Sequence, residues 1–347
     1  MASRSALRWE LHPVAGFDAL AATWDALNAA TLDAPVMDAR FFALSLEHFG
    51  SGRERVAIAR DGDRVVAAAI LEKTRAVAWQ SFQAAQAPMG AWLQRPELST
   101  ADLLASLQPA LGGTCLVLGV TQQDPELLPR PEDAAGLTSA DYIRTARVSV
   151  TGSFDDYWSA RGKNLRQNLR RQRNRLGREE VTTRMEAVAD PAAIGAAVDD
   201  YGQLESSGWK GEEGTSVHPD NAQGRFYHAL FTARSEEGEA TVYRYFYDDR
   251  LVACDLCLHR NGVLYLLKTA YCEQQKTSSP TMLMREEMFR KFFDGGQMQR
   301  IEFYGRVMNW HTKWSDEIRT MYHVNRYRPA LLAKLRGATA ANGDADG

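Results

Sequence analysis

The run Lys163–Arg178, KNLRQNLRRQRNRLGR, concentrates side chains that bind anions. Counted from Arg161, eight of eighteen residues are Lys or Arg, and none is acidic. Such side chains bind phosphate through charge-assisted hydrogen bonds. The run could therefore meet a phosphate-bearing substrate or RNA, or it could simply form a solvated helix face. Four residues fall on one face at helical spacing and predict a narrowly amphipathic helix over 163–177: Leu165, Leu169, Gln172 and Leu176.

Cysteine provides a second pattern with metal or redox chemistry. Cys254 and Cys257 in CDLC match the spacing C-x-x-C, while Cys115 and Cys272 stand alone. The segment has the pattern of a strand, in which residues three apart point to opposite sides and do not readily share a metal. We therefore favour small buried residues here and expect no metal. Four cysteines in a long cytosolic chain also argue against a disulfide framework.

A polar, glycine-rich stretch, SSGWKGEEG, holds Trp209 and Lys210. Loops of this kind often line binding sites, so either residue could contact a substrate, and Trp209 could instead close the preceding helix. The chain has no Gly-x-Ser-x-Gly elbow and no dinucleotide fingerprint.

The composition of the chain indicates the broad class of protein that carries these residues. The chain has 347 residues, 45% of them apolar and 24% charged, with a net charge of −3. These values are typical of a soluble globular protein of about two domains, in which the basic run is a local anomaly. The N-terminus, MASRSALRWELHPV, lacks the apolar core of a signal peptide. No stretch approaches the ~20 apolar residues that span a bilayer, so a cytoplasmic location is expected.

The chain contains an internal repeat. DRVVA at 63–67 matches DRLVA at 249–253, with an offset of 186 residues. RFF at 40–42 matches RFY at 225–227, and LVLG at 116–119 matches EFYG at 302–305, at nearly the same offset. Three collinear matches indicate the duplication of a module of about 150 residues, which is too long for a solenoid unit.

Both halves have the same expected order of elements. In the second, Asp190 and Pro191 begin a helix, Asn261-Gly262 predicts a hairpin turn, and Gly295-Gly296 ends a later helix. The expected elements of this half are helices at 191–204 and 226–231, strands at 241–247, 251–259 and 263–271, a helix at 280–294 and a strand at 300–304. Those of the first half are helices at 17–29 and 41–48, a hairpin at 56–72, a strand at 76–82, a helix at 100–111 and a strand at 114–120.

These elements predict an α+β fold with a mixed sheet, because hairpins precede a strand–helix–strand unit in each half. We expect a first module at 1–150 and a second at 151–335, with the basic linker helix 163–177 at the start of the second. The composition of 336–347 predicts a disordered tail.

This order of elements resembles the GNAT acyltransferase superfamily. Two such modules in one chain resemble the Fem-type peptidyltransferases and the GNAT proteins found near bacterial polysaccharide-synthesis genes. The second half carries the resemblance, over about residues 150–325, and the first half joins it through the repeat. The matching stretches are LRQNLRRQRNRLGRE, SGWKG, YCEQQKTSSPTMLM and EFYGRVMNWHTKW.

The resemblance implies transfer of an acyl group from a thioester or aminoacyl ester to a primary amine, without a metal. Such an enzyme holds the two reactants together, removes a proton and stabilises an oxyanion. The implied donor is acyl-CoA, with acetyl-CoA as one example, or an acyl carrier. The implied acceptor is an amine on a small molecule or on a polysaccharide or cell-envelope precursor.

Four residues match the place where GNAT proteins bind the CoA pyrophosphate: Gln275, Lys276, Ser278 and Ser279. The family pattern Q/R-x-x-G-x-G/A has two glycines, and both are missing here. Pro280 adds no N–H group to the loop. The departure leaves room for an aminoacyl-tRNA or a carrier-bound donor.

The resemblance also implies a set of catalytic residues. Lys313, before an aromatic near the end of the second module, corresponds to a lysine at the reaction centre of Fem-type enzymes. Asp255 or Glu302 could act as the general base, although Asp255 could equally face solvent. Tyr304 or Tyr271 could return a proton to the leaving group, or these tyrosines could simply pack in the core with their hydroxyls hydrogen-bonded. His311 is either a base or a neighbour of the site.

Six residues are expected to contact the substrate: Trp209, Lys210, Arg166, Arg170, Tyr271 and Arg306. The favoured function is an N-acyltransferase. One alternative is a Fem-like, aminoacyl-tRNA-dependent ligase, in which the basic run contacts RNA. Another is a non-catalytic GNAT scaffold. Other nucleic acids are not expected as partners, and the sequence leaves the oligomeric state open.

Overall fold

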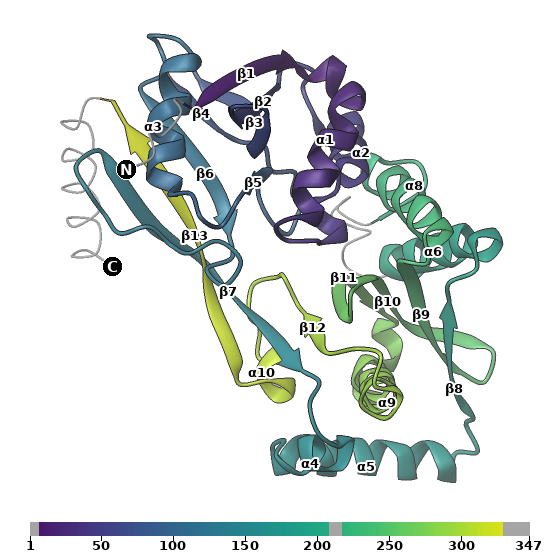
Figure 1. The fold of residues 1–347 in the computed structure, drawn as a ribbon. Helices are drawn as coiled ribbons and strands as arrows, with labels where there is room; N and C mark the ends of the chain where they lie inside the picture. The colour runs from purple at the N-terminus through teal and green to yellow at the C-terminus, as the bar shows by residue number, and fades with distance from the viewer. Residues whose placement is uncertain (1–6, 208–216, 329–347) are drawn as a thin grey trace, which may run out of the picture. The chain divides into compact units, whose positions relative to one another are not determined.

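A computed structural model describes residues 7–207 and 217–328 (Figure 1). These residues form two compact units. The second unit runs from Arg144 to Arg319, and the first takes the described residues on either side of it. Trp209, Lys210 and the expected tail at 336–347 lie outside the described residues.

The first unit consists of α-helices, β-strands and two short 3-10 helices. Its elements are β1 (Arg8–Pro13), η1 (Val14–Gly16), α1 (Phe17–Ala29), η2 (Pro35–Met37), α2 (Ala39–Phe49), β2 (Arg55–Asp61), β3 (Arg64–Arg75), β4 (Ala78–Ser81), β5 (Trp92–Gln94), α3 (Thr100–Ala110), β6 (Val117–Gln123) and β7 (Leu137–Ser149). The strands of its sheet follow the order β1-β2-β3-β4-β6-β13, with β5 on β3. All neighbours are antiparallel except β4 and β6, which are parallel.

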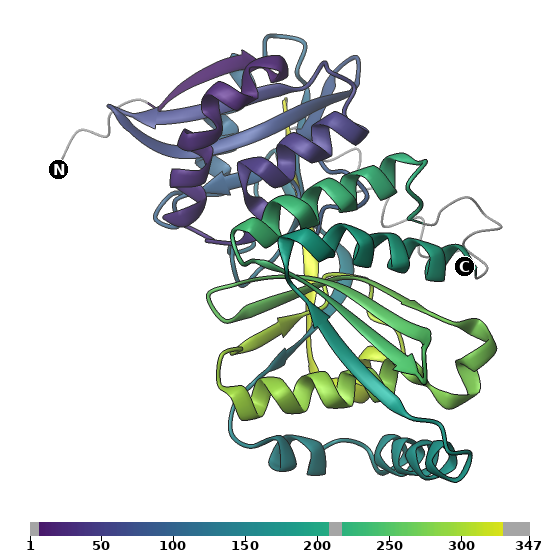
Figure 2. The same cartoon turned by 90° about the vertical axis from the view of Figure 1, so that its right-hand side faces the viewer.

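The second unit repeats this plan after two additional helices. Its elements are α4 (Phe154–Ser159), α5 (Lys163–Arg178), β8 (Thr183–Val188), α6 (Pro191–Ser206), α8 (Ala222–Glu236), β9 (Ala240–Tyr247), β10 (Arg250–Arg260), β11 (Val263–Tyr271), η3 (Glu273–Ser278), α9 (Pro280–Gly295), β12 (Arg300–Glu302), α10 (His311–Trp314) and the start of β13 (Glu317–Tyr327), most of which belongs to the first unit. Its sheet follows the order β7-β12-β11-β10-β9-β8, and only β11 and β12 are parallel. Helices α6 and α8 cover one face of this sheet, whereas α9 covers the other (Figure 2).

Each set of strands is therefore antiparallel except for one parallel pair, and the expected α+β class with a mixed sheet is confirmed. The repeat seen in the sequence corresponds to this shared order. In both units a strand, two helices, three antiparallel strands, a helix and a parallel strand follow one another.

Strands β7 and β13 each begin in one unit and end in the other. The end of β7, Arg147–Ser149, pairs with β12 in the second unit. Strand β13 pairs with β6 in the first unit, from Tyr322 to Tyr327. Because of these two strands, the compact units divide at Ile143/Arg144 and Arg319/Thr320, whereas the boundaries expected from the sequence were 1–150 and 151–335.

Local signals explain where several helices begin and end. The side chain of Asp190 caps α6 by accepting the N–H of Ala192, and Pro191 occupies the first helical position. Helix α9 ends at Gly295 and is capped by Gly296, whose φ of 64° is accessible to glycine at little cost. Asn261 and Gly262 both have positive φ in the turn between β10 and β11, as a two-residue hairpin requires.

Helix α5 buries the apolar side predicted for it, namely Leu165, Leu169, Gln172 and Leu176. Its other residues are half-buried or exposed, so the basic side chains lie outside the core of the unit. Helix α5 spans 163–178, where the sequence predicted an amphipathic helix over 163–177.

Candidate functional site

The parallel strands β11 and β12 pair over only three residues each. Val263–Tyr265 lies opposite Arg300–Glu302, and β12 then ends. Strand β11 continues to Tyr271, and no described strand pairs with its β12 side beyond Tyr265. An unpaired strand edge presents N–H and C=O groups that can pair with an extended ligand.

Asp255 lies within the sheet and is fully buried, at 0% exposure. The interpretation in which it faces solvent is therefore wrong. The guanidinium of Arg285, on α9, lies 3.4 Å from its carboxylate and donates a 2.6 Å hydrogen bond to Thr269. Burial raises the pKa of Asp255, and the positive charge of Arg285 opposes this shift. Asp255 Oδ2 and Arg285 Nε have no hydrogen-bond partner among the described residues.

Glu302 ends β12 and is also buried, at 2% exposure. One of its oxygens accepts a 2.7 Å hydrogen bond from Arg319, and the other lies 3.0 Å from Arg300. The half-buried Tyr304 follows two residues later, with its ring parallel to that of Tyr265. Arg319 also lies over the Tyr304 ring, 5.2 Å from its centre. Glu302 and Tyr304 are thus grouped where the pairing of β11 with β12 stops.

The short helix α10 has buried residues at its two ends and exposed residues between them. His311 and Trp314 are buried, whereas Lys313 is exposed and its side chain has no hydrogen bond or ion pair with another described residue. The carbonyl of Trp314 accepts hydrogen bonds from the hydroxyl of Tyr157, at 2.6 Å, and from Arg161, at 3.0 Å. These two hydrogen bonds hold the end of α10 in place, next to the exposed ammonium group of Lys313.

His311 lies against the ring of Trp310, with ring centres 3.5 Å apart. Its Nδ1 accepts the backbone N–H of Met308 at 2.9 Å. Burial and, second, the positive charge of Arg285 lower the pKa of His311 to about 4. The imidazole is therefore neutral near pH 7.

The loop before α9 differs from a glycine-rich phosphate loop in its backbone as well as in its sequence. Ser278 is buried, and its hydroxyl accepts from Tyr247 and donates to the carbonyl of Gln275. Ser279 adopts a left-handed conformation, with a φ of 55°, which is unfavourable for a residue with a Cβ atom. Lys276 is exposed. Of the four residues expected to bind a cofactor, Ser278 is thus already engaged within the protein.

The remaining expected substrate contacts are dispersed. Tyr271, at the end of β11, is half-buried, and Arg306 is exposed in the segment after β12. Arg166 donates to the carbonyl of Arg161 at 3.1 Å. Arg170 is exposed and has no hydrogen bond or ion pair through its side chain within the described residues.

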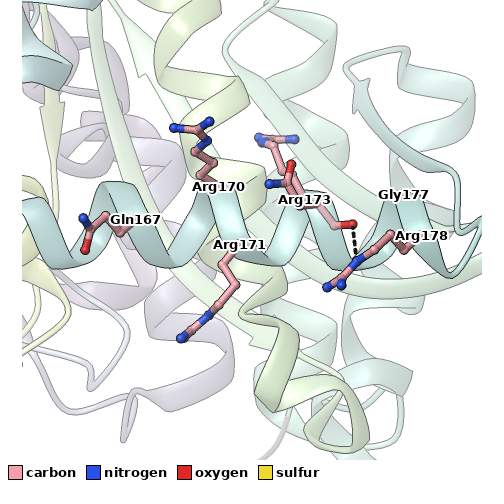
Figure 3. A pocket seen from close by; sticks show the side chains of 7 residues that line it. Gln167, Arg170, Arg171, Arg173, Gly177 and Arg178 are labelled. Atoms are coloured by element: carbon pink, nitrogen blue, oxygen red, sulfur yellow. Dashed lines mark hydrogen bonds between the residues drawn. The ribbon is translucent and has the colours of Figure 1, made fainter.

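Hollows flank α5, and Figure 3 shows one of about 750 Å³. Arg170 and Arg173 extend from one side of the helix in this view, whereas Arg171 and Arg178 extend from the other. Arg173 is held by Glu286 at 2.8 Å and by Glu287 at 3.0 Å, both on α9. Acidic residues therefore balance the charge of Arg173, whereas the charge of Arg170 in the same basic run is left unbalanced among the described residues.

Sequence reasoning missed Arg285, Arg319 and Tyr157. A signal existed for Arg285, because it stands among the buried residues of an otherwise apolar helix face. A charge in an apolar helix requires a partner, and Asp255 was the charge found in an apolar strand. The four cysteines are buried free thiols. No group of His, Cys, Asp and Glu among the described residues could hold a metal ion.

Residues 163–312 match the model of the acetyltransferase (GNAT) domain. This segment therefore belongs to the GNAT superfamily, and the GNAT-type recognition from sequence is confirmed. No curated protein is significantly similar to the chain in sequence. Within the described part of the chain, no helix is long and apolar enough to cross a membrane.

Solved structures share the fold over most of the chain. One is described as the C-terminal domain of a lysylphosphatidylglycerol synthetase from Agrobacterium fabrum, with a TM-score of 0.52, 13% identity and coverage of 88% of this chain and 95% of that one. A conserved protein of unknown function from Bacteroides thetaiotaomicron gives 0.54 at 10% identity, covering 93% and 100%. FemX gives 0.51 at 10% identity, covering 81% and 90%. At such identities the likeness shows the fold alone, and it confirms the Fem-type fold expected from the sequence.

Proposed function

We propose that the second unit is an N-acyltransferase. It moves an acyl group from a thioester, either acyl-CoA or an acyl carrier, to a primary amine on a small molecule or a cell-envelope or polysaccharide precursor. Acetyl-CoA is the simplest donor of this class. The GNAT match over residues 163–312 supports the class of reaction.

The observation that carries the proposal is the unpaired side of β11 beyond Tyr265. The extended thioester arm of the donor pairs with this edge, in the manner of an added strand. Its carbonyl then lies near the end of β12, where Glu302 and Tyr304 are grouped. Binding along the edge converts the encounter of thioester and amine into a reaction between positioned groups.

Each candidate residue has a role in this scheme. The ammonium group of Lys313 stabilises the negative charge that develops on the carbonyl oxygen. Glu302 accepts the proton of the attacking amine, and Tyr304 returns a proton to the departing thiolate. Asp255 and Arg285, which are buried and bound to each other, act as positioning residues. The amine forms the new amide bond while the carbon–sulfur bond breaks and a free thiol leaves.

Thiol release tests the proposal directly. The purified protein is incubated with acetyl-CoA and longer acyl-CoA thioesters, with and without a panel of amino sugars and diamines, and free thiol is measured. Amine-dependent thiol release, with an acylated amine found by mass spectrometry, is the expected result. Amine acylation from an aminoacyl ester without any from a thioester would overturn the proposal.

One observation favours an aminoacyl-tRNA donor instead. The loop before α9 has no glycine, Ser278 is engaged within the protein, and Pro280 has no N–H for a pyrophosphate. A Fem-like ligase would take its aminoacyl group from tRNA, with α5 in contact with the RNA. Such a protein would retain RNA during purification at low salt and lose it at high salt. A scaffold without catalysis would show neither activity.

A further inference from the structure

A groove of about 520 Å³ lies within the second unit, along α5 from Lys163 to Asn174. Its lining comes from three elements: Trp158 from α4, Glu286 from α9 and a row of polar side chains from α5. It is distinct from the unpaired edge of β11, since neither β11 nor β12 contributes to it. The proposed acyl transfer makes no use of this groove.

Three cations of the groove have no acidic partner. Lys163 and Arg170 are exposed and have no hydrogen bond or ion pair through their side chains within the described residues. Arg166 donates only to the backbone carbonyl of Arg161, which leaves its charge unbalanced. Arg173 differs, because Glu286 and Glu287 both bind it. The groove therefore presents a net charge of the sign that attracts anions.

The spacing of these cations sets the size of the anion. Lys163, Arg166 and Arg170 stand at positions i, i+3 and i+7, so they share one side of the helix over about 10 Å. Gln167 and Asn174 add amide donors to the same groove. A single phosphate is too small to meet all three cations, whereas two linked phosphates offer oxygens to each of them.

The residues that line the groove are poorly suited to bind RNA or a membrane surface. Its one aromatic residue, Trp158, already stacks with the rings of Phe154 and Trp314, at 5.7 and 5.8 Å. A base would need a free aromatic face to stack on. The cations also line a hollow, which suits a ligand that enters it better than a bilayer that lies against a convex surface.

We propose that the groove between α4, α5 and α9 binds the diphosphate group of a phosphorylated ligand. Arg170 and Lys163 contact the phosphates directly, and Arg166 adds a third cation. Arg173 stabilises the wall of the groove through Glu286 and does not compete for the ligand. The ligand binds without a chemical step, so the proposal stands independently of the acyl transfer.

Calorimetric titration with inorganic pyrophosphate tests this site on the full-length protein. We expect pyrophosphate to bind at least about tenfold more tightly than orthophosphate or sulfate at equal ionic strength. Arg170→Ala should weaken pyrophosphate binding by about tenfold or more, because it removes a charge-assisted contact. Arg171→Ala is the matched control: it removes the same charge from the same helix, on the side away from Arg170 (Figure 3). The control should bind pyrophosphate as the wild type does.

Further ligands identify the source of the diphosphate. CoA, ADP and farnesyl diphosphate are titrated in turn, and a ligand of this groove is one whose affinity falls in Arg170→Ala but not in Arg171→Ala. Equal affinity for pyrophosphate and sulfate would overturn the proposal, as would equal losses in both variants. Binding confined to single-stranded RNA or to anionic vesicles would also overturn it.

Discussion

The guanidinium carbon of Arg285 lies 4.1 Å from the centre of the Trp310 ring. The same guanidinium donates to Thr269 and pairs with Asp255. One buried side chain of α9 thereby contacts β10, β11 and the residue that precedes α10. This contact joins the helix that follows the η3 loop to the segment that carries Lys313.

Replacing Arg285 should destabilise the protein strongly. Arg285→Met keeps much of the side-chain volume but leaves the carboxylate of Asp255 buried without its cation. Breaking a buried pair in this way costs about 3–5 kcal/mol of the free energy of unfolding, measured by urea denaturation. Arg290→Met, on the same helix, is the control. Arg290 is half-exposed and pairs with an exposed carboxylate, Asp155, so its loss should cost no more than about 1 kcal/mol. Similar losses in the two variants would contradict the assignment.

His311 should make stability depend on pH in the mildly acidic range. Burial, followed by the charge of Arg285, lowers the pKa of His311 to about 4 from an ordinary value near 6.5. Between these values the unfolded chain takes up a proton that the folded protein does not. The contribution of His311 is therefore fully present above pH 6.5 and is lost as the pH falls to 4, by about 3 kcal/mol. In His311→Gln the free energy of unfolding should fall less steeply across this window, and an unchanged slope would show that the imidazole titrates normally.

Much of the fold follows from local patterns in the sequence. The caps at Asp190 and Gly296 and the turn at Asn261 act over a few residues, so the elements beside them could be predicted. No strand was expected at 137–149 or 317–327, yet β7 and β13 occupy these positions. Both strands are rich in polar and charged residues, and their partners lie far away in the sequence. Pairing at such separation leaves no local signal.

The candidate site was less predictable because its contacts are tertiary. Lys313, Glu302 and Asp255 were recognised as single residues, but the arginines that bind the two carboxylates were not. Glu302 is held by Arg319, and Asp255 by Arg285, which lies on another element. Charged residues in apolar segments predict that a partner exists, whereas the identity of the partner depends on how helices and strands pack.

Lys313 should be required for acyl transfer but not for folding. Its side chain is exposed and contacts no other described residue through a hydrogen bond or ion pair, so Lys313→Ala should unfold like the wild type. Loss of a group that stabilises an oxyanion typically lowers kcat by about 10²–10³, and thiol release would measure this. Lys291→Ala, on the exposed side of α9, should retain full activity. Wild-type turnover in Lys313→Ala would remove this lysine from the mechanism.

Replacing Tyr322 should show that the stability of the first unit depends on β13. The side chain is fully buried in the core of that unit, together with Val324, and its hydroxyl donates to the carbonyl of Leu128 at 2.9 Å. Tyr322→Ala removes a large aromatic ring from this core and should cost about 3–5 kcal/mol of the free energy of unfolding. Amide hydrogen exchange would show where stability is lost, because the N–H groups of β6 that pair with β13 should exchange faster. Tyr142→Ala, at a residue that is 45% exposed, should change neither quantity by much. If protection of β6 survives in Tyr322→Ala, the first unit folds without this strand.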